Sequence, residues 1–296
     1  MKLKRIAVLV MTAVIAFTLC GCAEIGNFLN QSTESNSNNS GKVENEFVSH
    51  YIDAGQGDSE FIELPNGQTM LIDASISDYG DKIVKFIKNL GYSKIDYVVA
   101  THPHADHIGG MKKVVDSFDI ENVYMPKVST NTKTYEKLLE TIKKKGLKIK
   151  TAKAGVSVIS EDNLKVDMLA PNSNSYESLN NYSAVIKITY KNNKFLYMGD
   201  AEKLSEDEIK ADISADVIKV GHHGSRTSSS NNFVKKVKPE YAVISVGEGN
   251  SYNHPHSEVV KRWEKIGAKI LRTDKNGSIS ITSDGDNISV KTEKQG

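Results

Sequence analysis

The chain has 296 residues, of which 39% are hydrophobic and 25% charged, with 38 basic residues against 37 acidic ones. This profile is typical of a globular chain and excludes a fibrous or wholly disordered protein. The net charge of +1 does not indicate a generally basic nucleic-acid-binding protein, although it is compatible with a local basic groove. Both cysteines, Cys20 and Cys22, lie near the N-terminus, which excludes a disulfide framework or a cysteine-ligated zinc site elsewhere.

The N-terminus has the pattern of an export signal. Basic residues at positions 2, 4 and 5 precede an apolar run over residues 6–19, which is shorter than the roughly 20 residues of a membrane-spanning helix. The run ends at Leu19-Cys20-Gly21-Cys22, which resembles the lipobox of a bacterial lipoprotein, with the lipid on Cys22. The alternative is an ordinary secretory signal with incidental cysteines. Either signal places the mature protein outside the cytoplasm, and lipidation of Cys22 would anchor it to the cell membrane.

The segment after the signal is polar. From Asn27 to Asn45 it consists mainly of Asn, Ser, Gln, Thr, Gly and Glu, and it has little apolar surface to bury. We therefore predict a lipoprotein signal peptide over residues 1–21, a flexible tether over 22–45 and one folded domain over 46–296.

Strand and helix patterns alternate through the folded domain. The predicted strands are 47–52, 61–64, 69–72, 97–100, 123–125, 164–169, 185–190, 194–198, 217–220, 241–246, 269–271, 278–282 and 288–291. The predicted helices are 83–90, 111–118, 135–145 and 258–266. Turns at Asn66-Gly67, Asn192-Asn193 and Asp284-Gly285 indicate antiparallel hairpins. Mixed sheets with interspersed helices, and no second linker, predict one layered α/β domain.

The strongest functional signal is His102-Pro103-His104-Ala105-Asp106-His107, directly after the predicted strand 97–100. Three imidazoles and a carboxylate this close together gain nothing from packing, and the imidazoles would repel one another when protonated. They are ligands that divalent transition metals prefer. We therefore predict that His102, His104, Asp106 and His107 bind metal.

This His-x-His-x-Asp-His pattern resembles the signature of the metallo-β-lactamase superfamily, and Gly109-Gly110 behind it also fits. The resemblance implies a four-layer αββα sandwich in a single domain. It also implies that Asp73 supports the metal loop by hydrogen bonding and that Asp200, after the strand 194–198, bridges two metals.

The last ligand implied by this resemblance lies in Val220-Gly221-His222-His223-Gly224-Ser225. Aligning the strand and the glycine favours His222, with His223 behind it or facing the substrate. Spacing alone cannot separate two adjacent histidines. Ser225 is expected in the same region, behind the ligands or against the substrate.

A narrower resemblance covers most of the chain after residue 45. It is carried by Asp53-Ala54-Gly55-Gln56-Gly57-Asp58-Ser59, by the His102 motif, by Lys219–Ser225, by Asn253-His254-Pro255-His256, and by Arg272-Thr273-Asp274 with Gly277. Together these motifs resemble the soluble hydrolase domain at the C-terminal end of the bacterial competence DNA-uptake channel. The pattern of a many-helix channel does not occur in this sequence, so the resemblance does not imply DNA transport.

Two of these motifs supply further candidates. In the first, the glycines allow a close-approaching loop, which would place Asp53, Gln56 and Asp58 at the wall of the site; a plain turn is the alternative. In the other, His254 and His256 are candidate catalytic residues. The alternative for this pair is a proline-braced loop before a helix capped by Ser257.

The catalytic candidates are thus the two histidines 254 and 256, together with His223 and the metal-binding Asp106. Histidine titrates near neutral pH, so these side chains could protonate a leaving group or bind an oxyanion.

The sequence departs from the superfamily pattern at one point. The superfamily usually supplies a third histidine to the first metal, but the corresponding stretch here is Asn180-Asn181-Tyr182-Ser183. Asparagine oxygen is a poor ligand for zinc but suits Mn²⁺ or Mg²⁺. We expect Asn180 or Asn181 near the first site, with Asn181 and Ser183 behind the ligands or against substrate. Water, His254 or His256 would complete the first site. We expect the protein to bind one or two divalent ions, zinc or manganese.

These observations predict a membrane-anchored, extracytoplasmic metal-dependent hydrolase. We expect a phosphodiesterase or nuclease that attacks a phosphodiester substrate, such as extracellular DNA, with a metal-activated hydroxide. Fold alone does not choose the substrate, so another ester, a lactone or a β-lactam stays open. The second class of function is a non-catalytic metal- or DNA-binding lipoprotein. No motif indicates a protein partner.

Overall fold

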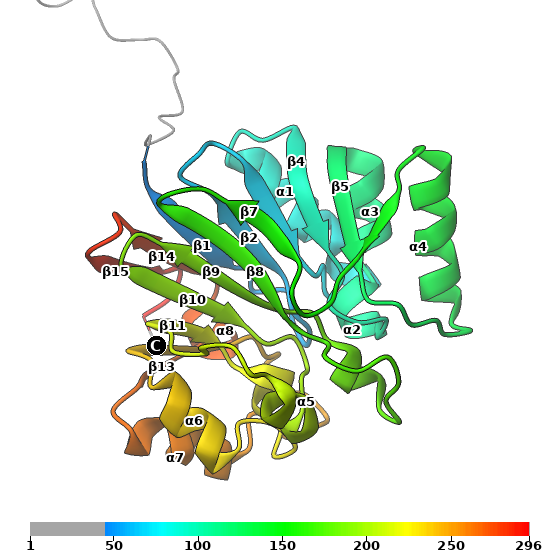
Figure 1. The fold of residues 1–296 in the computed structure, drawn as a ribbon. Coiled ribbons are helices and arrows are strands. Elements are labelled where there is room, and N and C mark those ends of the chain that lie inside the picture. Colours follow the sequence, from blue (N-terminus) through cyan, green and yellow to red (C-terminus); the bar gives the residue numbers. More distant parts are fainter. Residues whose placement is uncertain (1–44, 296) are drawn as a thin grey trace, which may run out of the picture. The chain divides into compact units, whose positions relative to one another are not determined.

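The computed structural model describes residues 45–295; the predictions for the signal peptide, for Cys22 and for the tether up to residue 44 lie outside the described residues. In this part of the chain two β-sheets lie face to face (Figure 1). The first sheet has eight strands in the order β15 (Ile288–Thr292), β14 (Ile279–Ser283), β1 (Phe47–Tyr51), β2 (Glu60–Glu63), β3 (Thr69–Ile72), β4 (Lys94–Val99), β5 (Asp119–Met125) and β6 (Ile149–Thr151). The second has seven in the order β13 (Lys269–Arg272), β12 (Tyr241–Ile244), β11 (Val217–Lys219), β10 (Asn193–Tyr197), β9 (Val185–Tyr190), β8 (Leu164–Ala170) and β7 (Ser157–Ser160).

Helices cover the outer faces of both sheets (Figure 1). The α-helices are α1 (Gly80–Asn89), α2 (Ala105–Ile108), α3 (Met111–Ser117), α4 (Lys133–Lys144), α5 (Lys203–Glu208), α6 (Asn231–Val237), α7 (Ser257–Lys265) and α8 (Thr273–Asn276). Three short 3₁₀ helices are η1 (Ser77–Tyr79), η2 (Leu179–Tyr182) and η3 (Gly221–Gly224). Apolar residues of α1, α3 and α4 form one core with the first sheet, and those of α6 and α7 form another with the second sheet.

A third core fills the space between the sheets. Phe47 of β1 and Phe195 of β10 meet there with ring centroids 4.2 Å apart, and both are fully buried. Burying one such side chain stabilises the fold by about 1.5–3 kcal/mol. The result is the four-layer αββα sandwich that the sequence predicted, in one domain.

The three predicted hairpins are confirmed, because β2–β3, β9–β10 and β14–β15 pair antiparallel. The sequence analysis missed the short strands β6 and β7 and the short helices α2, α5, α6 and α8. The suggested cap of α7 was wrong: this helix starts at Ser257, and its N-cap position is His256, which makes no side-chain capping bond. Among residues 45–295, no helix combines the length and apolar character that crossing a membrane requires.

The parallel part of each sheet positions the site. β3 and β4 run parallel in the first sheet, and β10 and β11 run parallel in the second. The loops that follow these four strands carry Asp73, the His102 motif, Asp200 and the His222-His223 pair, respectively. Loops at the carboxyl ends of parallel strands meet at one edge of a sheet, so the fold gathers these side chains in one place.

Candidate metal centre

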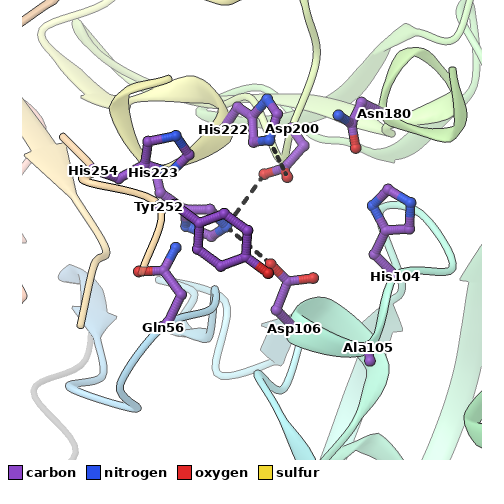
Figure 2. Close-up of a pocket in the computed structure, with 10 residues that line it drawn as sticks. All are labelled: Gln56, His104, Ala105, Asp106, Asn180, Asp200, His222, His223, Tyr252 and His254. Carbon is purple, nitrogen blue, oxygen red and sulfur yellow. Dashed lines mark ion pairs between the residues drawn. The ribbon is translucent and has the colours of Figure 1, made fainter. Parts of the chain in front are cut away.

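Asp200 lies at the middle of a cluster of buried imidazoles. Its carboxylate oxygens are 3.1 Å from His107 Nε2, 3.5 Å from His222 Nε2, 3.6 Å from His223 Nε2 and 3.9 Å from His102 Nε2. Figure 2 shows several of these side chains around a pocket of about 320 Å³. The described residues that line it are Gln56, His104, Ala105, Asp106, Asn180, Asp200, His222, His223, Tyr252 and His254.

One group of donors fits a metal ion. Ligand atoms of Asp106, His107, Asp200 and His223 all lie within 4.8 Å of one another. Atoms held about 2.0–2.3 Å from a shared ion lie at most about 4.6 Å apart, so little adjustment is needed. Within the described part of the chain, His107 Nε2, Asp200 Oδ1 and His223 Nε2 are buried and make no hydrogen bond, although Asp200 Oδ1 lies 3.1 and 3.6 Å from the two imidazole nitrogens. Buried polar atoms without partners are costly, and a shared cation would satisfy all three at once.

A second group shares Asp200. His102, His104 and Asp200 also have ligand atoms within 4.8 Å of one another, and His102 Nε2 is 2.9 Å from His104 Nδ1. On its other side, His102 Nδ1 is 3.2 Å from Thr101 Oγ1 and 3.3 Å from the hydroxyl of Ser183. Those contacts fix the ring so that Nε2 faces Asp200 and His104. Ser183 therefore lies behind His102, and its hydroxyl also accepts a hydrogen bond from the backbone N–H of Asp200.

Asp73 supports the loop that carries the His102 motif. Its carboxylate accepts hydrogen bonds from the backbone N–H and the hydroxyl of Thr101, at 2.8 and 2.6 Å. It is also 2.7 Å from His107 Nδ1, which leaves His107 Nε2 to face Asp200. This arrangement of a carboxylate behind a histidine orients the ring and increases its basicity toward a metal.

Asp58 and Lys219 form a buried ion pair that joins the two sheets. Lys219 Nζ at the end of β11 donates to Asp58 Oδ2 at 2.7 Å, and both side chains are only 1% exposed. The other oxygen of Asp58 is 3.1 Å from His223 Nδ1, and its backbone N–H donates to the carbonyl of Asp106. Asp58 thus contacts two of the segments that carry candidate ligands. Sequence reasoning missed Lys219, because a lysine at a strand end is usually exposed.

The geometry favours His223 over His222 as the last ligand, whereas the sequence analysis favoured His222. His222, His223 and Gly224 have successive φ angles of 51°, 51° and 81°, so three residues in a row are left-handed. For the two non-glycine residues this costs about 1–3 kcal/mol each and is typical of functional sites. The turn buries His223, with Nε2 3.5 Å from Asp106 Oδ2. It leaves the His222 ring 21% exposed, beside Thr227.

The structure also separates the two asparagines. Asn180 lines the pocket, and its Oδ1 is buried without a hydrogen-bond partner among the described residues. Asn181 does not line the pocket; its amide donates to Glu202 at 3.0 Å, and its Oδ1 accepts from the Glu202 backbone N–H. Of the two asparagines expected near the first site, Asn180 is therefore the one that faces the pocket, and Asn181 lies behind it against Glu202, to which the Asn180 amide also donates. Glu202 was missed by the sequence analysis, although it follows Asp200 by two residues.

The loop over residues 53–59 divides its candidates. Gln56 lines the pocket and accepts a hydrogen bond from the backbone N–H of Gly247. Asp53 does not line the pocket: its carboxylate is 3.4 Å from Lys82 Nζ, so its predicted place at the site wall is not supported. Ser225 is buried beside Thr227, where its hydroxyl accepts from the Thr227 backbone N–H, so it lies behind His222.

The remaining histidines form an aromatic wall. The ring of His254 lies 5.6 Å from His222, 4.9 Å from His256 and 5.7 Å from Tyr252, measured between centroids. His254 and Tyr252 line the pocket, whereas His256 packs behind His254. Tyr252, 61% exposed, was missed because a lone tyrosine carries no pattern.

Burial and nearby charges shift the pKa values of this cluster in opposite directions. Burial opposes protonation of His107 and His223, but the Asp200 carboxylate, with Asp73 and Asp58 respectively, outweighs it. The pKa of His107 is held well above its ordinary value, and that of His223 rises to about 10. Burial would by itself raise the pKa of Asp200, yet the surrounding imidazoles hold it well below its usual range.

His254 behaves differently. Its pKa falls to about 4, first because of burial and then because of the charges of His223 and His222. A neutral imidazole at pH 7 is a poor proton donor. His254 therefore suits the role of an acceptor that orients water or substrate better than that of a general acid.

A family model of the metallo-beta-lactamase superfamily matches residues 52–248. The chain belongs to this superfamily, which the fold and the His-x-His-x-Asp-His loop had indicated. Its clusters of histidine and aspartate side chains could hold metal ions, as in a metal-dependent hydrolase of that superfamily.

Among proteins of similar sequence, ComE operon protein 3 of Bacillus subtilis is 31% identical over 248 residues, which is 77% of this chain. Competence protein ComA of Neisseria gonorrhoeae is 28% identical over 242 residues, which is 80% of this chain. The match spans only 32% of each of those two proteins, about a third of their length.

Solved structures agree in fold. The diiron β-hydroxylase CmlA of Streptomyces venezuelae matches with a TM-score of 0.53 and 13% identity, over 76% of this chain and 52% of CmlA. The metallo-β-lactamase fold protein YhfI of Bacillus subtilis matches with a TM-score of 0.50 and 12% identity, over 77% of this chain and 96% of YhfI. At these identities the likeness concerns the fold alone.

The pKa shifts predict that metal affinity rises with pH. His107 and His223 have raised pKa values, so both rings are doubly protonated and positively charged at pH 7 in the metal-free protein. A metal ion must displace one proton from each ring. The carboxylates of Asp106 and Asp200, with lowered pKa values, are already ionised and add no dependence. We expect the Mn²⁺ association constant to rise about tenfold per pH unit for each proton released between pH 6.5 and 8.5. Calorimetric titration in two buffers of different ionisation enthalpy counts the protons; an affinity independent of pH would contradict these shifts.

Proposed function

We propose that the protein is a metal-dependent phosphodiesterase or nuclease. The observation that carries the proposal is the convergence of three unpartnered buried atoms, His107 Nε2, Asp200 Oδ1 and His223 Nε2, beside Asp106 at the base of an open pocket. Without a metal, only protonation of the two imidazoles compensates the buried Asp200 charge, whereas a divalent cation would satisfy all three atoms at once.

The residues divide between two metal positions. Asp106, His107, Asp200 and His223 would hold one ion, and His102, His104 and Asp200, with the oxygen of Asn180, would hold the other. Divalent ions there supply acidified water as nucleophile and neutralise charge on a phosphoryl oxygen.

The other residues position what binds. Asp73 orients His107. The backbone carbonyl of Ser245, 3.0 Å from His223 Nδ1, and the nearby Asp58 carboxylate orient His223, while Lys219 keeps Asp58 ionised. Gln56 and His254 line the pocket, where they would contact the substrate or its attacking water.

Two features favour a phosphodiester over an acyl substrate. Histidine, aspartate, asparagine and glutamine make up most of the described pocket lining, and their polar groups can hydrogen-bond the oxygens of a phosphodiester. Two metal positions that share one carboxylate suit in-line displacement at phosphorus. The relatives include a competence protein, and the sequence motifs resemble the hydrolase domain of the competence DNA-uptake channel, which suggests DNA as the phosphodiester. Extracellular DNA is therefore the substrate we would test after a small phosphodiester.

Replacing Asp106 by Ala should abolish hydrolysis of bis-p-nitrophenyl phosphate. The ion in the first group would lose one of its two carboxylate ligands, so we expect a fall in rate of about a hundredfold or more and a reduced metal content. Asp53→Ala is the matched control, since this nearby carboxylate pairs with Lys82 outside the pocket. Metal analysis and initial rates with Mn²⁺ and Zn²⁺ measure both effects. Full activity and metal content in Asp106→Ala, or a wild-type protein inactive with every divalent ion, would refute the proposal.

The oxygen ligand of Asn180 should make Mn²⁺ a better activator than Zn²⁺. Oxygen donors suit harder, higher-coordinate ions, whereas zinc favours nitrogen-rich tetrahedral sites. We expect Asn180→His to shift the ratio of rates toward zinc. Asn181→His, at a side chain that contacts Glu202 and does not line the pocket, should leave the ratio unchanged. A zinc preference in the wild-type protein, or equal effects of the two variants, would contradict this assignment.

We also propose that a lipid on Cys22 anchors the protein outside the cytoplasm. The support is the basic, apolar and cysteine-ended sequence of residues 1–22. Cys22→Ala should release the protein from the membrane fraction or leave the precursor uncleaved, whereas Cys20→Ala should fractionate as the wild type does. Fractionation followed by mass spectrometry of the N-terminal peptide measures the outcome; an unmodified Cys22 on a membrane-bound protein would contradict the proposal.

A further inference from the structure

A second cavity lies beside the candidate metal centre. Its volume is about 470 Å³, and its described lining residues are Lys203, Arg226, Thr227, Ser228, Ser230, Asn231, Asn232 and Arg262. Three of them are cations, the others offer hydroxyl or amide groups, and none of these lining residues is acidic. In a protein with a net charge of +1, three cations around one cavity are a local concentration of positive charge.

The wall between this cavity and the metal centre is thin. Thr227 lines the cavity, and its hydroxyl is 3.0 Å from Nδ1 of His222, which lines the metal-site pocket. The backbone carbonyl of Thr227 accepts from the backbone N–H of Lys203. Lys203 follows Asp200 by three residues, and Arg226 follows His223 by three. Three residues of chain span at most about 10 Å, so the backbones of both cationic residues lie within about 10 Å of a candidate ligand. Successive phosphates are spaced roughly 3.4 Å apart along the axis of a duplex strand, so a strand bound at the metal centre also reaches the cavity.

The cations already have carboxylate neighbours, but these do not occupy the cavity. Lys203 pairs with Asp207, while Arg226 and Arg262 share Glu258, at 3.8 and 3.7 Å. Exposed pairs at such distances contribute only about 0–1 kcal/mol, so a phosphate can replace them at little cost. Arg262 is also held in place by donating to the backbone carbonyl of Ser229 at 3.1 Å.

An exposed aromatic ring lies at the metal-site pocket. Tyr252 lines that pocket, stacks on His254 and keeps 61% of its surface exposed (Figure 2). Aromatic side chains with an open face bind unpaired bases, at about 1–3 kcal/mol per base. A basic cavity and an aromatic platform near one catalytic pocket are the two elements of a single-strand binding surface.

We propose that the substrate is a single-stranded polynucleotide, with a phosphate next to the scissile one bound by Lys203, Arg226 and Arg262 and a base stacked on Tyr252. This inference rests on the proposed phosphodiesterase function, but the binding surface itself does not need a metal ion.

The direct test is binding of a fluorescein-labelled single-stranded oligonucleotide of about twelve nucleotides to the metal-free protein. Fluorescence anisotropy over a salt series gives the affinity and the number of phosphates that the protein neutralises. We expect the double variant Lys203→Ala/Arg226→Ala to bind about tenfold more weakly, and the slope of log K against log salt to fall by about 0.7 for each phosphate that is no longer neutralised. Glu258→Gln should bind more tightly than the wild type, because it removes the competing carboxylate.

The matched control is Lys235→Ala/Lys236→Ala, which removes two cations from the other end of α6, away from the metal centre. This variant should bind as the wild type does. Tyr252→Ala should weaken binding of the oligonucleotide. Its affinity for inorganic polyphosphate, which has no bases, should equal that of the wild type. Equal losses in both double variants, or no loss in Lys203→Ala/Arg226→Ala, would overturn the proposal.

Hydrolysis assays distinguish the proposed binding surface from the proposed phosphodiesterase function. With Mn²⁺, the Lys203→Ala/Arg226→Ala variant should raise KM for the oligonucleotide about tenfold and leave the rate with bis-p-nitrophenyl phosphate unchanged. A wild-type protein that binds the oligonucleotide through these residues but hydrolyses neither compound would refute the phosphodiesterase function and support the binding surface. A protein that hydrolyses the small phosphodiester, with oligonucleotide binding insensitive to these residues, would refute the binding surface alone.

Discussion

The site depends on the electrostatic cost of one buried carboxylate, that of Asp200, which is 1% exposed and has four imidazoles within 4 Å. Without a cation the carboxylate draws protons onto His107 and His223, whose pKa values rise. Even so, several nitrogen and oxygen atoms stay unpaired. A divalent ion held by these residues would satisfy the same atoms with fewer protons, so metal and protons would compete for the site.

The fold meets this cost by supporting the cluster from both sheets. Asp73 fixes His107 from the first sheet, and the Asp58–Lys219 pair connects the first sheet to the end of β11 in the second. Breaking a buried pair of this kind typically costs about 3–5 kcal/mol, because the remaining charge has no partner. The left-handed turn at His222 and His223 stores additional strain, which these contacts hold in place. The contacts that hold the two sheets together thus also position the candidate ligands.

The local features of the site were predictable, and the features that depend on tertiary geometry were not. The His102 motif lies within six residues, so its chemistry can be read directly from the chain. The choice between His222 and His223 depends on a left-handed turn that L-residues rarely adopt. Asn180 and Asn181 lie on the 3₁₀ helix η2, so the choice of the one that faces the pocket depends on how this helix packs, which the sequence does not reveal. Lys219 was invisible because its burial depends on Asp58, 161 residues away.

Anomalous X-ray diffraction tests the central claim most directly. Crystals of the protein soaked in Mn²⁺, with data collected above and below the manganese absorption edge, locate each ion without reference to activity. The account predicts one anomalous peak within about 2.3 Å of ligand atoms of Asp106, His107, Asp200 and His223. A second peak should lie among His102, His104, Asp200 and Asn180. An anomalous map with no peak at this cluster, or one with ions bound only elsewhere on the protein, would contradict it.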